Sequence, residues 1–197
     1  MKKLLSACAV AAAFVSAPAM AQGYIGLGLG SSSISGYDQT VLGAKFSGGD
    51  TTKTSFKILG GYNYTPNWGV EVQYTALGKR AISVTPTLPG TINTNSLDFS
   101  QLGLYGTGTL PVNGSFSLFG KLGLSANSGK ATDTGGGSDS ETNTSLSFGV
   151  GASYKLTPNL TVRAEYEDFG KVIKADPQNN IGDVKASNFS VSLLYRF

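Results

Sequence analysis

Residues 188–197, at the C-terminal end of the chain, read NFSVSLLYRF and decide how the rest of the sequence is interpreted. A strand places alternate side chains on opposite faces, so this stretch predicts a strand with one apolar face. The apolar set takes every second position: Phe189, Val191, Leu193, Tyr195 and Phe197. An apolar strand left unpaired at a terminus would invite uncontrolled pairing. We therefore expect it to pair with the first strand and close a barrel whose apolar face meets lipid.

Alternating runs of the same kind precede this one along the chain. The eight runs occupy residues 23–31, 54–64, 68–77, 96–110, 115–125, 144–155, 160–169 and 188–197. The alternation changes parity early in the fourth run, so we expect a β-bulge near Ser100. No segment after the N-terminal region holds about 18 continuous apolar residues, the length of a spanning helix. The sequence predicts an all-β fold, an eight-stranded antiparallel up-and-down transmembrane β-barrel.

Short turns alternate with long polar stretches between these runs. The short turns are Thr65-Pro66-Asn67, residues 111–114 and residues 156–159, and each contains proline or Asn-Gly, which favour tight turns. The long stretches are residues 32–53, 78–95, 126–143 and 170–187, and the third is expected to be mobile because it is rich in Gly, Ser, Thr and Asp. Long loops at one end and short turns at the other are typical of outer-membrane barrels.

The N-terminal residues 1–21 have the features of a cleavable signal peptide. Lys2 and Lys3 precede a short Ala-rich apolar stretch, and Ala19-Met20-Ala21 offers a small-x-small cleavage pattern. We predict a mature protein that starts at Gln22 and consists of one barrel domain, residues 22–197. The intact mass of the purified protein checks this start. A mass corresponding to a chain lipidated at Cys8 would contradict it.

The composition argues against catalysis. The sequence contains no histidine, and its single cysteine lies in the predicted signal peptide. Acyl transfer by serine needs a base close to neutral pH, which is usually a histidine. We expect no enzymatic activity, no metal or other cofactor and no nucleic-acid partner. Glycine patterns such as residues 26–30 lack the helix that a dinucleotide site requires.

Charged residues fall at inward parity in several runs. Glu71 and Arg163 each lie four residues after the asparagine of similar turns, so we expect them to meet across the lumen. Lys57, Lys121 and Glu165 share the inward parity and could extend this pair into a lumenal charge network. The simpler interpretation, charges that merely fill a wet lumen, also fits, because ionic lumen residues are common in such barrels.

Aromatic residues cluster beside the short turns and predict a periplasmic girdle that includes Tyr62, Tyr64, Trp68 and Tyr154. The sequence also repeats itself. Residues 65–74 and 157–166 align at a constant offset, and the match continues to Gly78-Lys79 and Gly170-Lys171. The third and seventh strands are therefore predicted to be equivalent strands of two four-stranded halves.

The closing strand, the 157–159 turn with the strand after it, and residues 68–74 resemble the eight-stranded domain of outer-membrane protein A. The resemblance extends loosely over residues 23–197. It implies a structural surface protein, an adhesin or a narrow ion pore, with Glu71 and Arg163 on two positions of that family's lumenal gate. Thr107 and Ser153 replace a lysine and a glutamate of that gate. The chain end, Tyr195 and Phe197, resembles the signal read by the outer-membrane assembly machinery.

These features together predict an integral protein of the cell outer membrane. We expect a structural, surface-exposed barrel with four long extracellular loops, acting in adhesion or envelope integrity, with a lumen largely plugged by polar and charged side chains. The alternative is a narrow porin-like channel for ions or small solutes. The expected partners are outer-membrane lipid and lipopolysaccharide, the barrel-assembly machinery and periplasmic chaperones, and a host or surface ligand at the loops.

Overall fold

The computed structural model describes residues 22–35, 39–41, 44–48, 52–85, 95–132, 138–173 and 184–197. Its strands are β1 (Gln22–Ser35), β2 (Gln39–Val41), β3 (Ala44–Gly48), β4 (Thr52–Asn63), β5 (Trp68–Thr85), β6 (Asn95–Pro111), β7 (Phe116–Thr132), β8 (Ser138–Lys155), β9 (Leu160–Ile173) and β10 (Val184–Arg196). Among these residues no helix is long and apolar enough to cross a membrane. The predicted signal peptide, residues 1–21, lies outside the described residues.

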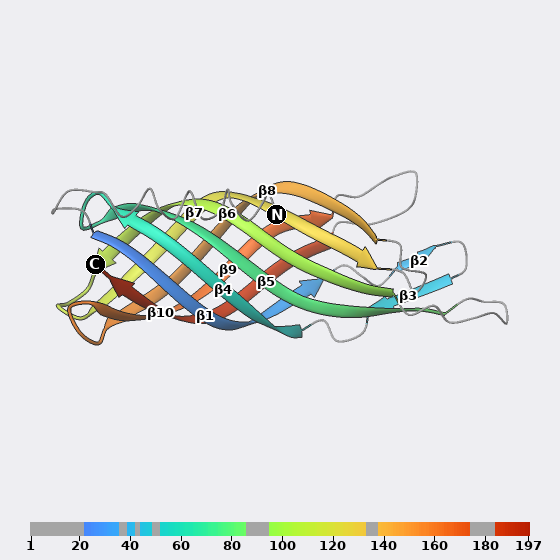
Figure 1. The fold of residues 1–197 in the computed structure, drawn as a ribbon, viewed down its shortest axis with the longest axis horizontal. Coiled ribbons are helices and arrows are strands. Elements are labelled where there is room, and N and C mark those ends of the chain that lie inside the picture. The colour runs from blue at the N-terminus through green and yellow to red at the C-terminus, as the bar shows by residue number, and fades with distance from the viewer. Residues whose placement is uncertain are drawn as a thin grey trace.

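Eight of the strands form a closed antiparallel barrel, which confirms the predicted fold class (Figure 1). They follow one another around the wall as β1, β4, β5, β6, β7, β8, β9 and β10, and β10 returns to pair with β1. The closing pairing runs to the end of the chain, where the Phe197 amide donates a hydrogen bond of 3.0 Å to the Gly23 carbonyl. Closure leaves the barrel wall without an unpaired edge.

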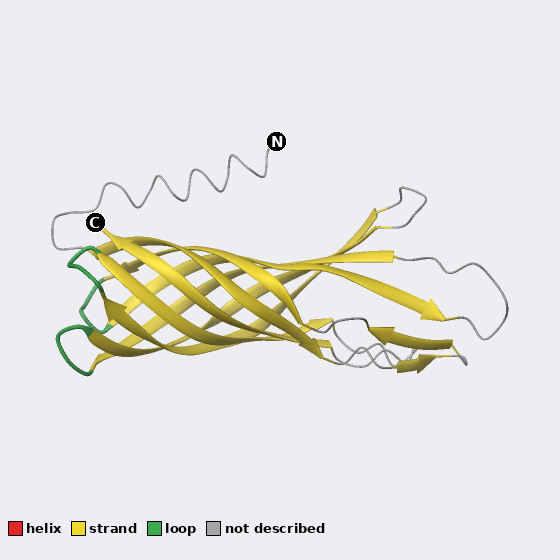
Figure 2. Ribbon diagram, turned by 90° about the horizontal axis from the view of Figure 1, so that it is seen from below, coloured by secondary structure: helices red, strands yellow, loops and turns green. Residues whose placement is uncertain are grey.

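All four of the expected long stretches contain strand residues, and two of them hold new strand pairing over much of their length. Residues 32–53 hold the β2–β3 hairpin, because β5 extends past the start of β4 and its free edge pairs with β3 from Lys45↔Thr85 to Gly48↔Ile82. Residues 126–143, expected to be mobile, are mostly paired strand, with β7 and β8 in register out to Thr132↔Ser138. The polar composition of these residues predicted loops, but pairing in a hairpin satisfies the backbone hydrogen bonds whatever the side chains are. Figure 2 shows these strands continuing beyond the barrel.

The three short turns lie together at the opposite end, as predicted (green in Figure 2). Side chains fix their geometry: the Thr65 hydroxyl accepts from the Trp68 amide at 2.9 Å, and the Asn113 carbonyl oxygen accepts from the Phe116 amide at 2.7 Å. Asn67 and Asn159 occupy equivalent places in the repeat. Each donates a 2.9 Å hydrogen bond to a neighbouring strand, at the Thr109 and Arg196 carbonyls respectively.

Side chains alternate between a polar interior and an apolar exterior along each strand of the barrel. The large exposed apolar residues belong to all eight barrel strands, for example Leu29, Ile58, Val70, Leu104, Leu122, Val150, Tyr166 and Val191. Most buried residues are polar or charged. A soluble barrel would have the reverse arrangement, so this exterior is suited to lipid.

A bulge does occur at the level of Ser100, but on the partner strand and not in β6 as expected. From Asp98 to Thr107 the alternation in β6 is uninterrupted, and Phe99 points into the barrel, buried to 3% exposure. The extra residue lies in β5, where Ala76 pairs with Ser100 and Lys79 with Asp98, and the register shifts again between β9 and β10 on both sides of Lys185. Glycines with positive φ lie in the bulged segments of β5 and β9, Gly78 at 83° and Gly170 at 68°, a conformation that side-chain-bearing residues rarely adopt. These glycines are equivalent in the internal repeat.

Candidate functional site

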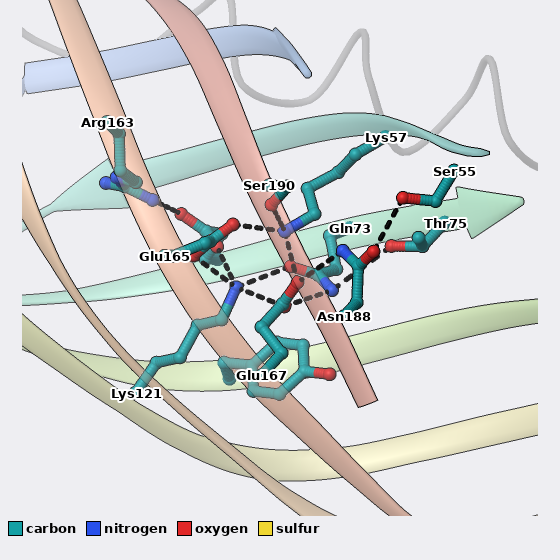
Figure 3. A network of polar contacts seen from close by, with 12 residues as sticks. Ser55, Lys57, Gln73, Thr75, Lys121, Arg163, Glu165, Glu167, Asn188 and Ser190 are labelled. Atoms are coloured by element: carbon teal, nitrogen blue, oxygen red, sulfur yellow. Dashed lines mark hydrogen bonds and ion pairs between the residues drawn. The ribbon is translucent and has the colours of Figure 1, made fainter. Parts of the chain in front are cut away.

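Six ionised side chains converge inside the barrel and form what we call the lumenal network: Lys57, Glu71, Lys121, Arg163, Glu165 and Glu167. Figure 3 labels all of them except Glu71. They come from β4, β5, β7 and β9, on different sides of the wall. None is more than 9% exposed. Three cations face three anions, so the network is neutral as a whole. Neutrality matters because an uncompensated charge at this burial would be costly.

Four of these residues form a closed ring of alternating charge, the charge ring. Lys57 pairs with both Glu165 and Glu167. Lys121 reaches the same two carboxylates from β7, with its Nζ 3.0 Å from Glu165 Oε2 and 2.7 Å from Glu167 Oε1. Within the ring, each lysine therefore contacts both acids and each acid contacts both lysines. The β4 and β7 sides of the barrel are joined to β9 by these contacts.

Glu71 links the charge ring to Arg163. One of its oxygens lies 3.1 Å from Lys121 Nζ, and the other accepts hydrogen bonds from Arg163 and from the Tyr24 hydroxyl, the latter at 2.9 Å. The Arg163 guanidinium also lies over the Phe119 ring, 4.4 Å from its centroid. Glu71 and Arg163 are equivalent positions of the internal repeat, so the predicted meeting across the lumen occurs between the third and seventh strands of the wall.

Neutral polar side chains complete the contacts around the charge ring (Figure 3). The Gln73 amide donates to Glu167 at 2.7 Å and its oxygen accepts from Lys121 at 2.6 Å. Ser190 accepts from Lys57 at 2.9 Å, and the Asn188 amide donates to Glu167 at 3.3 Å. These hydrogen bonds engage carboxylate lone pairs and lysine N–H groups that the ion pairs do not use. A buried ion pair needs such additional hydrogen bonds in order to be stable.

A second layer of the interior is apolar. It consists of Ile34, Leu77, Phe99, Phe169 and Ala186, and we call it the apolar layer. On β5, Leu77 is further from the short turns than Glu71, and on β9, Phe169 is further than Arg163, so the layer lies on the loop side of the network. Leu77 and Phe169 are fully buried and each directly precedes a bulge glycine. This layer was not predicted from the sequence.

Lumenal glycines lie where large side chains cross the interior. A Cβ at Gly151 would contact the Phe119 ring, and one at Gly149 would lie 2.9 Å from Lys121 Cε. A Cβ at Gly61 would overlap the Tyr24 ring. The space that these glycines leave is filled by neighbouring side chains, as expected in a barrel of this width.

The structure brings all five predicted lumenal residues into contact, Lys57, Glu71, Lys121, Arg163 and Glu165. Two further residues of the site, one in the network and one in contact with it, were not predicted. Glu167 has the same parity as Glu165 and supplies the third negative charge, so counting inward charges would have found it. Tyr24, which is buried, was also missed, although it has the inward parity of Gly26 and Gly28 in the first run.

The predicted girdle and assembly residues lie at the short-turn end of the barrel. Tyr64, Trp68 and Tyr154 are exposed, with 61%, 60% and 52% of their surface accessible, and Tyr62 is half-buried. The Tyr195 and Phe197 rings meet edge to face, with 5.8 Å between centroids. Their role in assembly stays a prediction. In the described part of the chain, no group of His, Cys, Asp and Glu residues could hold a metal ion.

Comparisons with known proteins agree with this architecture. The family model of the outer membrane protein beta-barrel domain matches residues 5–197 of this chain. Ail, the attachment invasion locus protein of Yersinia pestis, solved in complex with the heparin analogue sucrose octasulfate, is 22% identical with a TM-score of 0.56, over 90% of this chain and 99% of that chain. Neisserial surface protein A is 20% identical with a TM-score of 0.59, over 89% and 97%.

AlkL, an outer membrane protein solved by solid-state NMR in DMPC bilayers, is 16% identical with a TM-score of 0.58, over 89% of this chain and 90% of that chain. At these identities the similarity shows a shared fold. No curated protein matches the chain significantly.

Proposed function

From the premise that this chain belongs to the outer membrane protein β-barrel domain family, and is an integral protein of the outer membrane, we propose that it is a closed structural barrel that displays its outer strands and loops. The observation that carries this proposal is the lumenal network. Its six charges are buried, paired and mutually neutralising, and they reach across the interior from β4, β5, β7 and β9. The apolar layer adds a second obstruction on the loop side.

The function of such a barrel lies outside the lumen. β5 through β8 continue past the barrel at the end away from the short turns, where the β2–β3 hairpin pairs with β5 (Figure 2). A rigid wall that holds these segments suits surface contact or support of the envelope. Ail, which shares this fold, forms a complex with a heparin analogue. We propose that a surface ligand of this chain binds at the loop end of the barrel.

Catalysis forms no part of this proposal. The sequence has no histidine that could act as a base for a lumenal serine. Ser145, for example, donates its hydroxyl proton to the Phe169 carbonyl at 2.6 Å. The proposed biogenesis partners are periplasmic chaperones and the assembly machinery, which would read Tyr195 and Phe197.

Conductance in planar lipid bilayers tests the closed barrel. The native protein is expected to give no steady single-channel current, because a solvated ion would have to displace interlocked ion pairs. The double variant Glu71→Ala/Arg163→Ala is expected to stay closed as well, since it removes one charge of each sign and leaves the charge ring and apolar layer in place.

Steady openings of the native protein would contradict the proposal and would favour the narrow channel for ions or small solutes. Lys155→Ala serves as the control variant, because Lys155 is exposed at the short-turn end and contacts no member of the lumenal network in the structure.

A further inference from the structure

Four buried side-chain atoms in the described part of the chain have no hydrogen-bond partner, and three of them belong to neighbouring inward residues. The three are Arg163 Nε, Glu165 Oε2 and Ser192 Oγ. The fourth, Asn127 Oδ1, lies on the loop side, where the amide nitrogen of the same residue bonds the serines of β7 and β8. Most buried polar groups are paired with protein or with ordered water, so three such atoms on adjacent residues point to a ligand.

The pairing of β9 with β10 brings the three residues together. Ser192 is the direct cross-strand partner of Arg163, and Glu165 is the next inward residue on β9. Cross-strand partners have Cβ atoms about 4.5–5.5 Å apart. Successive inward residues of one strand are about 7 Å apart. One water molecule bridges groups at this spacing, because each of its hydrogen bonds spans about 2.7–3.2 Å.

The unused groups are two donors and one acceptor. Glu71 takes only Nη1 of Arg163, which leaves the Nε–H available, and the Ser192 hydroxyl is the second donor. The acceptor is Glu165 Oε2, which lies 3.0 Å from Lys121 Nζ in an ion pair that lacks the geometry of a hydrogen bond. A water accepts two hydrogen bonds and donates to a third group, and buried waters typically make about three. An anion would suit both donors but would face the Glu165 carboxylate.

A glycine borders the site on the side of β1. Gly28 is the cross-strand partner of Ser192, and a Cβ at this position would overlap the Ser192 hydroxyl. A residue with a side chain at position 28 would therefore displace the hydroxyl from the site.

The site also lies on the side of the network that water reaches. The Arg163 side chain is 11% exposed, whereas the Glu165 side chain is 0% exposed. Nearer the short turns, the inward residues Thr161 and Ser117 are 8% and 7% exposed. On the loop side, Gln101 is completely buried. Exposure of the lumen thus decreases from the short turns toward the charge ring.

We propose that Arg163, Glu165 and Ser192 bind one ordered water molecule. The water accepts hydrogen bonds from Arg163 Nε–H and the Ser192 hydroxyl and donates one to Glu165 Oε2. It thereby joins Arg163 to β10 and completes the hydrogen bonding of the lumenal network. One bound water leaves the lumen closed, so the conductance experiment tests the proposed function independently of this site.

Solid-state NMR in hydrated lipid bilayers, with magnetisation transferred from water to the protein, tests the site. Transfer to Arg163 Nε–H in the native protein is expected to be several-fold faster than transfer to the Gln101 side-chain amide, which is bonded to the Tyr105 hydroxyl. Ser192→Val, which replaces the hydroxyl with methyl groups, is expected to displace the water and lower the rate at Arg163 several-fold. Ser125→Val is the matched control, because Ser125 lies on the loop side, and should leave that rate unchanged.

Ser192→Ala adds no volume and serves as a second variant if Ser192→Val does not fold. It is expected to lower the transfer rate at Arg163 as well, because the water loses one of its three partners. The site is overturned if Arg163 Nε–H in the native protein receives magnetisation no faster than the Gln101 amide. It is also overturned if the rate at Arg163 is the same in the native protein and in the Ser192 variants.

Discussion

Replacing Lys121 with methionine is expected to destabilise the barrel by about 3–5 kcal/mol, the usual cost of removing one partner from a buried ion pair. Lys121 contacts the carboxylates of Glu71, Glu165 and Glu167 within 3.1 Å. Without it, three buried acids face two cations. Methionine keeps most of the side-chain volume, so the loss reports charge more than packing. Urea unfolding in lipid vesicles, followed by unheated gel migration, measures the change.

The control for this prediction is Lys130→Met, on the same strand. Lys130 is exposed, and surface substitutions usually change stability by less than about 0.5 kcal/mol. Adding Glu167→Gln to Lys121→Met should restore part of the lost stability, because Lys57 and Glu165 then remain as a neutral pair. If Lys121→Met unfolds at the same urea concentration as the native protein, the charges are hydrated and the wet-lumen interpretation holds.

Phe169→Ala is expected to cost about 3–5 kcal/mol, the range for truncating a buried phenylalanine. The Phe169 ring is fully buried in the apolar layer with Leu77 and Phe99. Its truncation leaves a cavity on the loop side of the charge ring, while the backbone carbonyl keeps its hydrogen bonds from Ser145 and Asn127. The same urea assay measures this loss.

Phe169→Leu is the matched variant and should cost less than about 1.5 kcal/mol, because it keeps an apolar side chain of similar volume. The Phe169→Ala barrel should still pass no steady current, since the lumenal network remains across the interior. If the Phe169→Ala variant is as stable as the native protein, the apolar layer is not tightly packed.

The strand pattern was predictable because it is local. Alternation is imposed by the backbone of each strand, so residues such as Leu193 and Ser192 could be assigned to opposite faces without knowing any neighbour. The short turns were found for the same reason, since Pro66 and Asn113 act within a few residues of themselves. Closure between the first and last strands followed from the apolar end of the chain at Phe197.

Errors arose where a residue's surroundings depend on distant strands. The apolar residue Phe99 has the opposite parity to the later apolar residues of its run, and a bulge near Ser100 was inferred from that change. The structure keeps the parity and buries Phe99 against Leu77 and Phe169 from other strands. The sequence of β2 and β3 is typical of a polar loop. These strands form because β5 extends past β4 and offers a free edge to β3.

The sequence by itself determined the barrel, the orientation of its wall and the inward parity of the five predicted charges. Only the tertiary structure decided which of those charges meet, because contact across a lumen depends on the stagger of strands that are far apart in the chain. The sequence predicted that Glu71 meets Arg163, because the two residues occupy equivalent positions in the two repeated halves of the barrel. That Lys121 joins three carboxylates, and that Glu167 balances the charge, follows from the relative height of β4, β7 and β9 around the closed wall.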